Sequence, residues 1–432
     1  MKKAASFALG CKVNQYESEA IAELFAEKEY EIVGIEDEAD VYVINTCTVT
    51  NFGDKKSRQL IRKVKRQNPN AIVAVVGCYA QTAPQELMQV EGVNLVIGTK
   101  DRAQIVEMVE NYDVSRGVEN HVTDIMKERV FEPLSIQKLT NRTRAYLKIQ
   151  DGCSQYCSYC IIPYARGPIR SREPQEVLAE VKRLADNGFK EVVLTGIHVA
   201  SYGKDRKDTD LLTIVKQVHE VEGIERIRFS SIEPNVVTEA FAQEMAGLPK
   251  VCDHFHLSLQ SGCDRTLKEM NRKYDTEKYR QAAAILRKHM PHVALTTDII
   301  VGFPGETEED FKESYAFAEE IGFAKIHVFP YSPKKGTPAA ERKDQLPNAV
   351  KSERSHTLIA LSDKMAQDFL TPYIGQEMEV LFERAVGEGV YEGHTTNYIK
   401  VRATAQQDLT NCICKTKITA AEQEELRGEV QG

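Results

Sequence analysis

The sequence lacks several features that mark common classes of protein. It has no run of about 18 consecutive apolar residues, so we expect no transmembrane helix and no membrane partner. Its net charge is −8, so any contact with nucleic acid has to come from local basic patches rather than from the surface as a whole. Tryptophan is absent, which leaves tyrosine, phenylalanine and arginine as the side chains that could stack on a base.

Histidine is missing around the most distinctive motif. Cys153, Cys157 and Cys160 have CxxxCxxC spacing, and no histidine lies between Cys153 and His198. A closed zinc site would need a fourth cysteine or a nearby histidine. Three thiolates suit a cubane iron–sulfur cluster in which one iron has no protein ligand. Such an iron can chelate a small molecule, so the motif indicates a reactive site rather than a structural one.

Length and composition indicate a soluble protein of several domains. The chain has 432 residues, of which 42% are hydrophobic and 28% charged, and this length predicts about three domains. The apolar part of residues 1–10 is short and is broken by residues 11–15, so we interpret it as a buried strand rather than a signal peptide. We expect a cytoplasmic protein, because thiols stay reduced and available to metals there.

The first segment alternates short buried strands with helices, a pattern typical of a parallel sheet covered by helices. Cys11, Cys47 and Cys78 each fall at or just past the end of a predicted strand, the edge where open α/β sheets bind ligands. Each cysteine alone would be interpreted as a small buried hydrophobe. Their shared position favours a second site of three thiolates. The expected strands are 3–9, 41–46, 71–76 and 95–98, and the expected helices are 17–28, 55–66 and 84–90.

The central segment repeats a strand–helix unit six times. Six units cannot close an eight-unit barrel, so we expect an open, partial barrel with its chemistry at the carboxyl ends of the strands. From about residue 371, short strands at 377–383, 398–402 and 412–418 predict a small antiparallel barrel of OB type. The expected central strands are 145–149, 191–195, 226–230, 254–259, 294–300 and 325–329. The predicted divisions are residues 1–112, a linker over 113–142, residues 143–370 and residues 371–432.

Polar or glycine-rich residues follow several of the central strands. Glycine lets backbone approach a ligand closely, and serine, glutamine and glutamate can bond ribose and amino groups. Each position alone is compatible with ordinary turn chemistry. Their recurrence at successive strand ends predicts a cofactor site. The candidate residues are Gly196, Glu233, Ser258, Gln260, Gly302, Pro304 and Gly305.

Basic residues gather in two places. The predicted helix 55–66 is either a solvated helix face or a surface that contacts phosphates, and the sequence favours neither. The last segment has a basic strand for which the same two interpretations stay open. The candidate RNA-binding residues are Lys55, Lys56, Arg58, Arg62, Lys400 and Arg402.

The cysteine motif, with Tyr159 before its last cysteine, resembles the radical S-adenosylmethionine superfamily, and residues 302–306 resemble the adenine-side motif of that superfamily. Cys11, Cys47 and Cys78 and the small C-terminal barrel extend the resemblance to the methylthiotransferases over essentially the whole chain. The resemblance implies an N-terminal methylthiotransferase domain, a radical domain and a TRAM domain. It also implies two 4Fe-4S clusters on the two cysteine sets and a site for S-adenosylmethionine that includes Tyr159.

Residues 9–17, Leu-Gly-Cys-Lys-Val-Asn-Gln-Tyr-Glu, look most like the branch that acts on N6-threonylcarbamoyladenosine in tRNA. Relatives that act on isopentenyladenosine typically show Gly-Cys-Gln-Met-Asn, and those that act on a ribosomal protein show Gly-Cys-Pro-Lys-Asn. The resemblance implies methylthiolation of C2 of adenosine 37, in the anticodon loop of tRNA, with an electron donor and a sulfur donor as further partners. Isopentenyladenosine or a ribosomal protein as substrate, and an iron–sulfur electron carrier or RNA-binding protein, are the alternatives.

Overall fold

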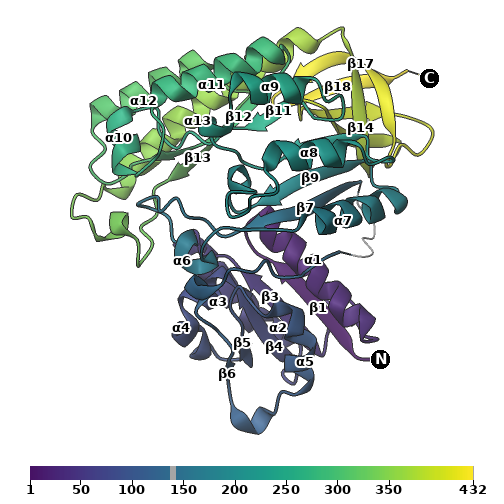
Figure 1. Ribbon diagram of the computed structural model, residues 1–432, viewed down its shortest axis with the longest axis vertical. Helices are drawn as coiled ribbons and strands as arrows, with labels where there is room; N and C mark the ends of the chain where they lie inside the picture. Colours follow the sequence, from purple (N-terminus) through teal and green to yellow (C-terminus); the bar gives the residue numbers. More distant parts are fainter. Residues whose placement is uncertain (137–142, 432) are drawn as a thin grey trace.

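The computed structural model describes residues 1–136 and 143–431, which form three units built on sheets (Figure 1). The predicted fold class is confirmed, with an N-terminal parallel sheet, a partial barrel in the centre and a closed C-terminal barrel. The domain boundaries after residues 112, 142 and 370 stay a prediction. Residues 137–142 of the predicted linker lie outside the described residues. Within the described residues, no helix has the length and apolar character needed to cross a membrane.

The N-terminal sheet has the strand order β2-β1-β3-β4-β5-β6, and every neighbouring pair is parallel. The last strand, β6, lies inside the predicted linker and extends this sheet. The strands are β1 Lys3–Ala8, β2 Glu31–Ile32, β3 Val41–Thr46, β4 Ile72–Gly77, β5 Leu95–Val96 and β6 Glu119–Asn120. The helices are α1 Lys12–Glu27, α2 Asn51–Gln67, α3 Cys78–Thr82, α4 Pro84–Met88 and α5 Ile105–Glu110.

Strand β3 explains why this sheet is covered on both faces. All six of its residues are buried. Val41 and Val43 pack with residues of α1 and α5, whereas Tyr42 and Ile44 pack with residues of α2. Alternate side chains of a strand point to opposite faces, so a continuous apolar run requires cover on each side.

Helix α1 begins five residues before its predicted start at residue 17. Its first turns contain the polar residues that precede the predicted helix, and Asn14 and Tyr16 among them are fully buried. The early start places Cys11 at the N-cap position of the helix. The helix therefore presents this cysteine at the edge of the sheet where β1 ends.

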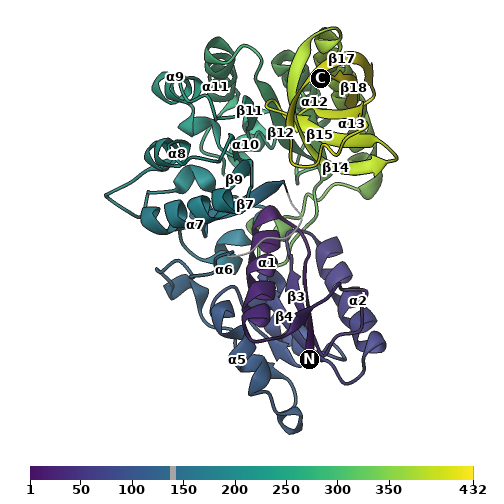
Figure 2. The same ribbon diagram turned by 90° about the vertical axis from the view of Figure 1, so that its right-hand side faces the viewer.

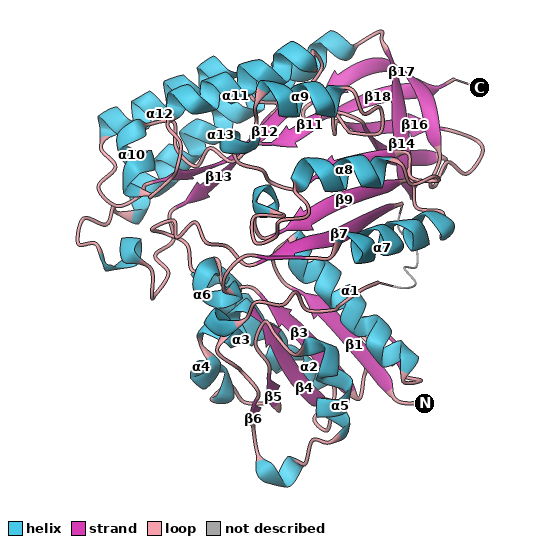
Figure 3. Cartoon of the chain, viewed as in Figure 1, coloured by secondary structure: helices cyan, strands magenta, loops and turns pink. Residues whose placement is uncertain are grey.

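The central unit has six parallel strands in the order β7-β9-β10-β11-β12-β13, with the short β8 antiparallel to β7. Strands β7 and β9 and strands β11, β12 and β13 can be followed in Figure 3. Isolated bridges from Ile227 to Val251 and from Ile232 to Leu257 join its two sheets into one partial barrel. The strands are β7 Arg144–Asp151, β8 Arg170–Ser171, β9 Glu191–Gly196, β10 Arg226–Phe229, β11 His254–His256, β12 Ala294–Val301 and β13 Lys325–Pro330. The helices are α6 Ile162–Arg166, α7 Pro174–Asp186, α8 Leu211–His219, α9 Glu239–Ala246, α10 Asp264–Glu269, α11 Thr276–His289, α12 Glu308–Ile321 and α13 Asn348–Leu370.

The C-terminal unit is a closed barrel with the order β14-β15-β16-β18-β17. Its pairings are antiparallel except for β16 with β18, which is parallel and differs from the expected fully antiparallel barrel. Five is an odd number, and a ring of five strands cannot alternate direction at every step, so at least one pair has to be parallel. The strands are β14 Glu377–Gly387, β15 Val390–Thr395, β16 Lys400–Thr404, β17 Ile413–Glu422 and β18 Glu425–Val430.

The C-terminal barrel and the central unit lie side by side in both views (Figures 1 and 2). Two arginines of β10 attach the barrel to the central unit. Arg226 donates to the carbonyls of His394 and Glu379 at 2.9 and 3.0 Å. Arg228 donates to the carbonyl of Thr396 at 3.0 Å and to the carboxylate of Glu191 at 2.9 Å. The barrel is thus held by hydrogen bonds from charged groups to backbone, which are stronger than bonds between neutral groups.

The Glu191 carboxylate predicts a pH dependence of stability. Burial alone would raise its pKa, but Arg228 and Arg144 lower it to about 2 overall. A group with a depressed pKa stabilises the folded state above its unfolded-state pKa and loses that contribution as the pH falls toward the folded-state pKa. We therefore expect the free energy of unfolding to fall by on the order of 3 kcal/mol between about pH 5 and pH 2 because of this one group.

Urea unfolding of the wild type and of Glu191→Gln, measured at several pH values, checks this expectation. The variant should be less stable at pH 7, and its stability should vary less with pH over this range. Equal pH profiles for the two proteins would show that Glu191 does not carry the effect.

Candidate active site

The CxxxCxxC motif forms the loop between β7 and α6. Gly152 opens the loop with φ of +72°, and a Cβ there would lie 1.9 Å from the carbonyl oxygen of Pro168, so this position excludes any other residue. Arg272 donates to the Sγ of Cys157 at 3.0 Å. Burial raises the pKa of Cys153 to about 11 and that of Cys160 to about 12, and the neighbouring cysteines add to the effect.

Cys11, Cys47 and Cys78 follow β1, β3 and β4, which are neighbours in the sheet, so the structure brings them to one edge. Gly10, with φ of +97°, allows close packing, since a Cβ there would lie 2.7 Å from the Sγ of Cys47. Burial, together with the charges of Cys78 and Cys11, raises the pKa of Cys47 to about 12.

Both cysteine sets fit an iron–sulfur cluster by the chemistry of their donors. Each offers three sulfur atoms at one place, which leaves one iron of a cubane without a protein ligand. Burial raises the pKa of Cys47, Cys78, Cys153 and Cys160, and cluster binding has to release the protons that these four thiols carry. Arg166 donates from Nε to the Sγ of Cys78 at 3.2 Å, as Arg272 does to Cys157 in the other set. Each set therefore has a cation placed to stabilise a thiolate.

One cavity of about 1010 Å³ joins the CxxxCxxC set to Cys11. Its wall comes from the central strands along their length, from the start of α1 and from residues 397–400 of the C-terminal barrel, so all three units contribute. Four of the predicted cofactor-binding residues line it: Tyr159, Gly196, Glu233 and Ser258. A site shared by three units can hold a cofactor and a large substrate at the same time.

Glu233 lies at the centre of a charged group on this wall. It receives a hydrogen bond from Arg272 at 2.7 Å and faces Nε2 of His198 at 3.0 Å. Burial alone would raise the pKa of Glu233, but His198 and Arg272 lower it overall. Neither His198 nor Arg272 was predicted from the sequence as a site residue. The position of His198, two residues beyond the end of β9, could have indicated a side chain at the ligand-binding edge of the strands. Arg272 does not follow a strand, so its position gave no such indication.

The remaining predicted cofactor residues lie outside the lining of this cavity: Gln260, Gly302, Pro304 and Gly305. The amide of Gly302 donates to Glu306, whose carboxylate pairs with Arg354. A Cβ on Gly305 would collide with Arg342 and Asp344. In this structure the segment therefore packs against the region that precedes α13 and against α13 itself, and its role toward a cofactor stays a prediction.

The predicted RNA-binding residues occupy different environments. Lys55, Lys56 and Arg62 are exposed on α2, and a shallow hollow of about 590 Å³ lies between this helix and Phe7 of β1. Arg58 is ion-paired with Glu86 at 3.0 Å. In the C-terminal barrel Lys400 pairs with Glu425, and Arg402 pairs with Glu425 and Glu392. Carboxylates therefore offset the charge in the barrel, which leaves α2 as the more basic surface.

Comparisons with known proteins cover the whole chain. A model of the radical SAM superfamily matches residues 147–318, and a model of the uncharacterized protein family UPF0004 matches residues 3–98. A threonylcarbamoyladenosine tRNA methylthiotransferase of Bacillus subtilis is 47% identical over 98% of this chain and 94% of its own length. A tRNA-2-methylthio-N(6)-dimethylallyladenosine synthase of Moorella thermoacetica is 35% identical over 98% of this chain and 96% of its own length.

The fold is also found among solved structures. The radical S-adenosylmethionine methyltransferase TsrM of Kitasatospora setae, solved with cobalamin and a 4Fe-4S cluster bound, aligns with a TM-score of 0.58 at 16% identity. The alignment covers 79% of this chain and 77% of that one. At this identity the likeness concerns the fold alone.

Proposed function

Because the chain belongs to the radical S-adenosylmethionine tRNA methylthiotransferases, we propose that it methylthiolates C2 of N6-threonylcarbamoyladenosine at position 37 of tRNA. The family membership makes the protein a methylthio-transferring enzyme of tRNA that uses S-adenosylmethionine and two 4Fe-4S clusters. The observation that carries the choice of substrate is the identity of 47% to a threonylcarbamoyladenosine enzyme, against 35% to a dimethylallyladenosine enzyme.

The six cysteines would hold the clusters in two sets of three. Cys153, Cys157 and Cys160 would bind one cluster, and Cys11, Cys47 and Cys78 the other. When bound, the cofactors supply the radical, the sulfur and the methyl group. The C2–H bond has no acidic proton, so we expect no side chain to act as a general base. The protein binds and orients the reactants and excludes water.

The geometry supports the assignment of one cluster to each cysteine set and of substrate binding to the cavity between them. Cys11 and the CxxxCxxC set open on the same cavity, so a nucleobase in that cavity can reach both cluster sites. Arg272 and His198 fix the Glu233 carboxylate on the wall, where it suits the amino or hydroxyl groups of S-adenosylmethionine. Position 37 lies in a single-stranded loop whose bases a protein can splay out. Exposed lysines and arginines of α2 are placed to contact the phosphate backbone.

The partners beyond tRNA are part of the proposal. The reaction needs an electron donor, such as a reductase, and a source of sulfur, and both would reach the protein in the cytoplasm. We propose that the three units act as methylthiotransferase, radical and TRAM domains, with the divisions predicted from the sequence.

Nucleoside mass spectrometry of tRNA from a strain that lacks the gene tests the substrate. We expect 2-methylthio-N6-threonylcarbamoyladenosine to disappear and its unmethylthiolated precursor to accumulate, because the proposed enzyme modifies C2 of an adenosine whose N6 side chain is already complete. The methylthiolated isopentenyl nucleoside should not change and serves as the internal control. Loss of that nucleoside alone would assign the isopentenyl substrate, and no change in either would exclude both tRNA substrates.

A further inference from the structure

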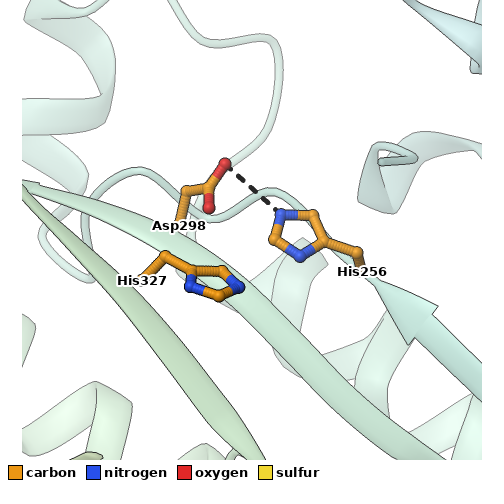
Figure 4. A group of neighbouring side chains, drawn as sticks. All are labelled: His256, Asp298 and His327. Atoms are coloured by element: carbon orange, nitrogen blue, oxygen red, sulfur yellow. Dashed lines mark ion pairs between the residues drawn. The ribbon is translucent and has the colours of Figure 1, made fainter. Parts of the chain in front are cut away.

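Three polar side chains lie side by side on the inner wall of the cavity, on three neighbouring strands. His256 of β11, Asp298 of β12 and His327 of β13 line the cavity together, and we call them the polar wall (Figure 4). Nε2 of His256 lies 3.3 Å from the carboxylate of Asp298, and the two imidazole rings stack with centroids 5.9 Å apart. The interior of a closed eight-unit barrel is filled mainly by branched apolar side chains, whereas these polar groups face an open cavity and suit a polar ligand.

Lys12 also lines this cavity, from the first turn of α1 and next to Cys11. Of the residues that the structure describes, three lysines line the cavity. Lys325 pairs with Glu424, and Lys400 pairs with Glu425 at 2.8 Å. No carboxylate in the described part of the chain forms an ion pair with Lys12. Arg144 and Arg228 repel its charge, Glu191 and Asp298 attract it, and its ammonium group lies 5.9 Å from the centre of the Tyr146 ring. Lys12 therefore brings an ammonium group without an ion-pair partner among these residues to the space beside the polar wall.

These groups match one of the two modified adenosines. The threonylcarbamoyl group carries a carboxylate, a hydroxyl and an N–H, whereas the isopentenyl group is wholly apolar. An apolar substituent in this space would desolvate Lys12 and Asp298 without offering either a partner, which is costly. A substituent with a carboxylate and hydrogen-bond donors would satisfy both.

We propose that Lys12 and the polar wall form the pocket for the threonylcarbamoyl group. Lys12 binds the carboxylate, Asp298 accepts a hydrogen bond from the hydroxyl or the N–H, and the two histidines flank the chain between them. The pocket selects N6-threonylcarbamoyladenosine over isopentenyladenosine at the site next to Cys11. This inference rests on the proposed function and adds the residues that determine its specificity.

Binding to the full-length protein loaded with its clusters, measured without reductant so that no turnover occurs, tests the pocket without depending on catalysis. The probes are three anticodon stem-loops of one sequence, with adenosine, N6-threonylcarbamoyladenosine or N6-isopentenyladenosine at position 37, and fluorescence anisotropy measures their affinity. For Lys12→Gln we expect a loss of roughly tenfold or more toward the threonylcarbamoyl stem-loop, since a charge-assisted hydrogen bond is removed. Affinity for the unmodified stem-loop should change less than about twofold.

Other variants separate charge from structure. Lys28→Gln removes the same charge from the exposed C-terminal end of α1 and should leave all three affinities unchanged. Lys12→Arg keeps the charge and should recover part of the loss. Asp298→Asn changes a residue of a different element, β12, and should also weaken binding of the threonylcarbamoyl stem-loop alone, which keeps the test valid if Lys12→Gln misfolds.

The possible failures are distinguishable. If the wild type does not prefer the threonylcarbamoyl stem-loop and does not methylthiolate it, the proposed function is wrong. If the wild type prefers it while Lys12→Gln and Asp298→Asn keep the same preference, the proposed pocket is wrong and the function stands. Equal weakening of all three stem-loops by Lys12→Gln would assign Lys12 to general RNA contact and would also overturn the pocket.

Discussion

Replacing Cys157 with Ala is expected to abolish both the cleavage of S-adenosylmethionine and the methylthiolated product. Cys157 belongs to the set that we propose for the radical-forming cluster, and it receives the hydrogen bond from Arg272 at 3.0 Å. Without one of three sulfur ligands, the remaining two cannot hold a cubane against loss of iron. Iron content should fall to about half of the wild-type value, because the second set is untouched.

Replacing Cys47 with Ala tests the role of the other cysteine set. It removes a ligand from the other set, so S-adenosylmethionine should still be cleaved to 5′-deoxyadenosine while the methylthiolated nucleoside is lost. Chromatography of 5′-deoxyadenosine and mass spectrometry of the nucleoside, from the same reaction, measure the two outcomes. Cys412→Ala changes an exposed cysteine outside both sets and should behave as the wild type. Full product formation by Cys47→Ala would contradict the division of work between two clusters.

The sequence predicted most of the fold because alternating strands and helices leave a strong local pattern. The same pattern placed Cys11, Cys47 and Cys78 at one edge, since parallel strands end on the same side of a sheet. The barrel was harder to predict. Strands β15 and β18 were not predicted, since each is only partly buried and contains a glycine, Gly393 or Gly428, that interrupts the apolar alternation.

The sequence did not predict the buried charges that join the N-terminal and central units. Glu17 is fully buried and forms ion pairs with Arg102, Arg166 and Lys148. Periodicity identifies buried positions, but it does not show which charged residue pairs with another one that is more than a hundred positions away. Lys148 and Asp151, two of the three charged residues in the largely buried β7, could have indicated these pairs, because charged residues are rarely buried without a partner.

Arg166 connects this charged group to the second cysteine set. Its Nε donates to the Sγ of Cys78 at 3.2 Å, and its Nη2 donates to Asn14 Oδ1 at 2.7 Å. Its other contacts are to the carboxylates of Glu17 and Asp151, and Asp151 lies two residues before Cys153. One buried guanidinium thus touches one cysteine site and a residue beside the other. We interpret Arg166 as a positioning residue that fixes the two sites relative to each other.

Replacing Arg166 with Met is expected to lower the free energy of unfolding by about 3–5 kcal/mol, because it leaves buried carboxylates short of a cation. It should also reduce the iron held by the Cys11, Cys47 and Cys78 set, since Cys78 loses its hydrogen-bond donor. Urea unfolding measures the first effect. Iron and sulfide analysis, combined with the electron paramagnetic resonance spectrum of the reduced clusters, measures the second.

Two further variants decide whether Arg166 acts through charge or through geometry. Arg166→Lys keeps the charge but loses the planar fork that reaches Cys78 and Glu17 together, so stability should recover more than the spectrum of the second cluster does. Arg206→Met removes an arginine that pairs with exposed carboxylates, Glu173 and Asp208, and should cost no more than about 1 kcal/mol. If Arg166→Met lowered stability and left both cluster spectra and the product yield unchanged, Arg166 would be a structural residue of the interface. A change in the spectrum of the second cluster in Arg166→Lys, at near wild-type stability, would show that the guanidinium geometry itself holds the cysteine site in place.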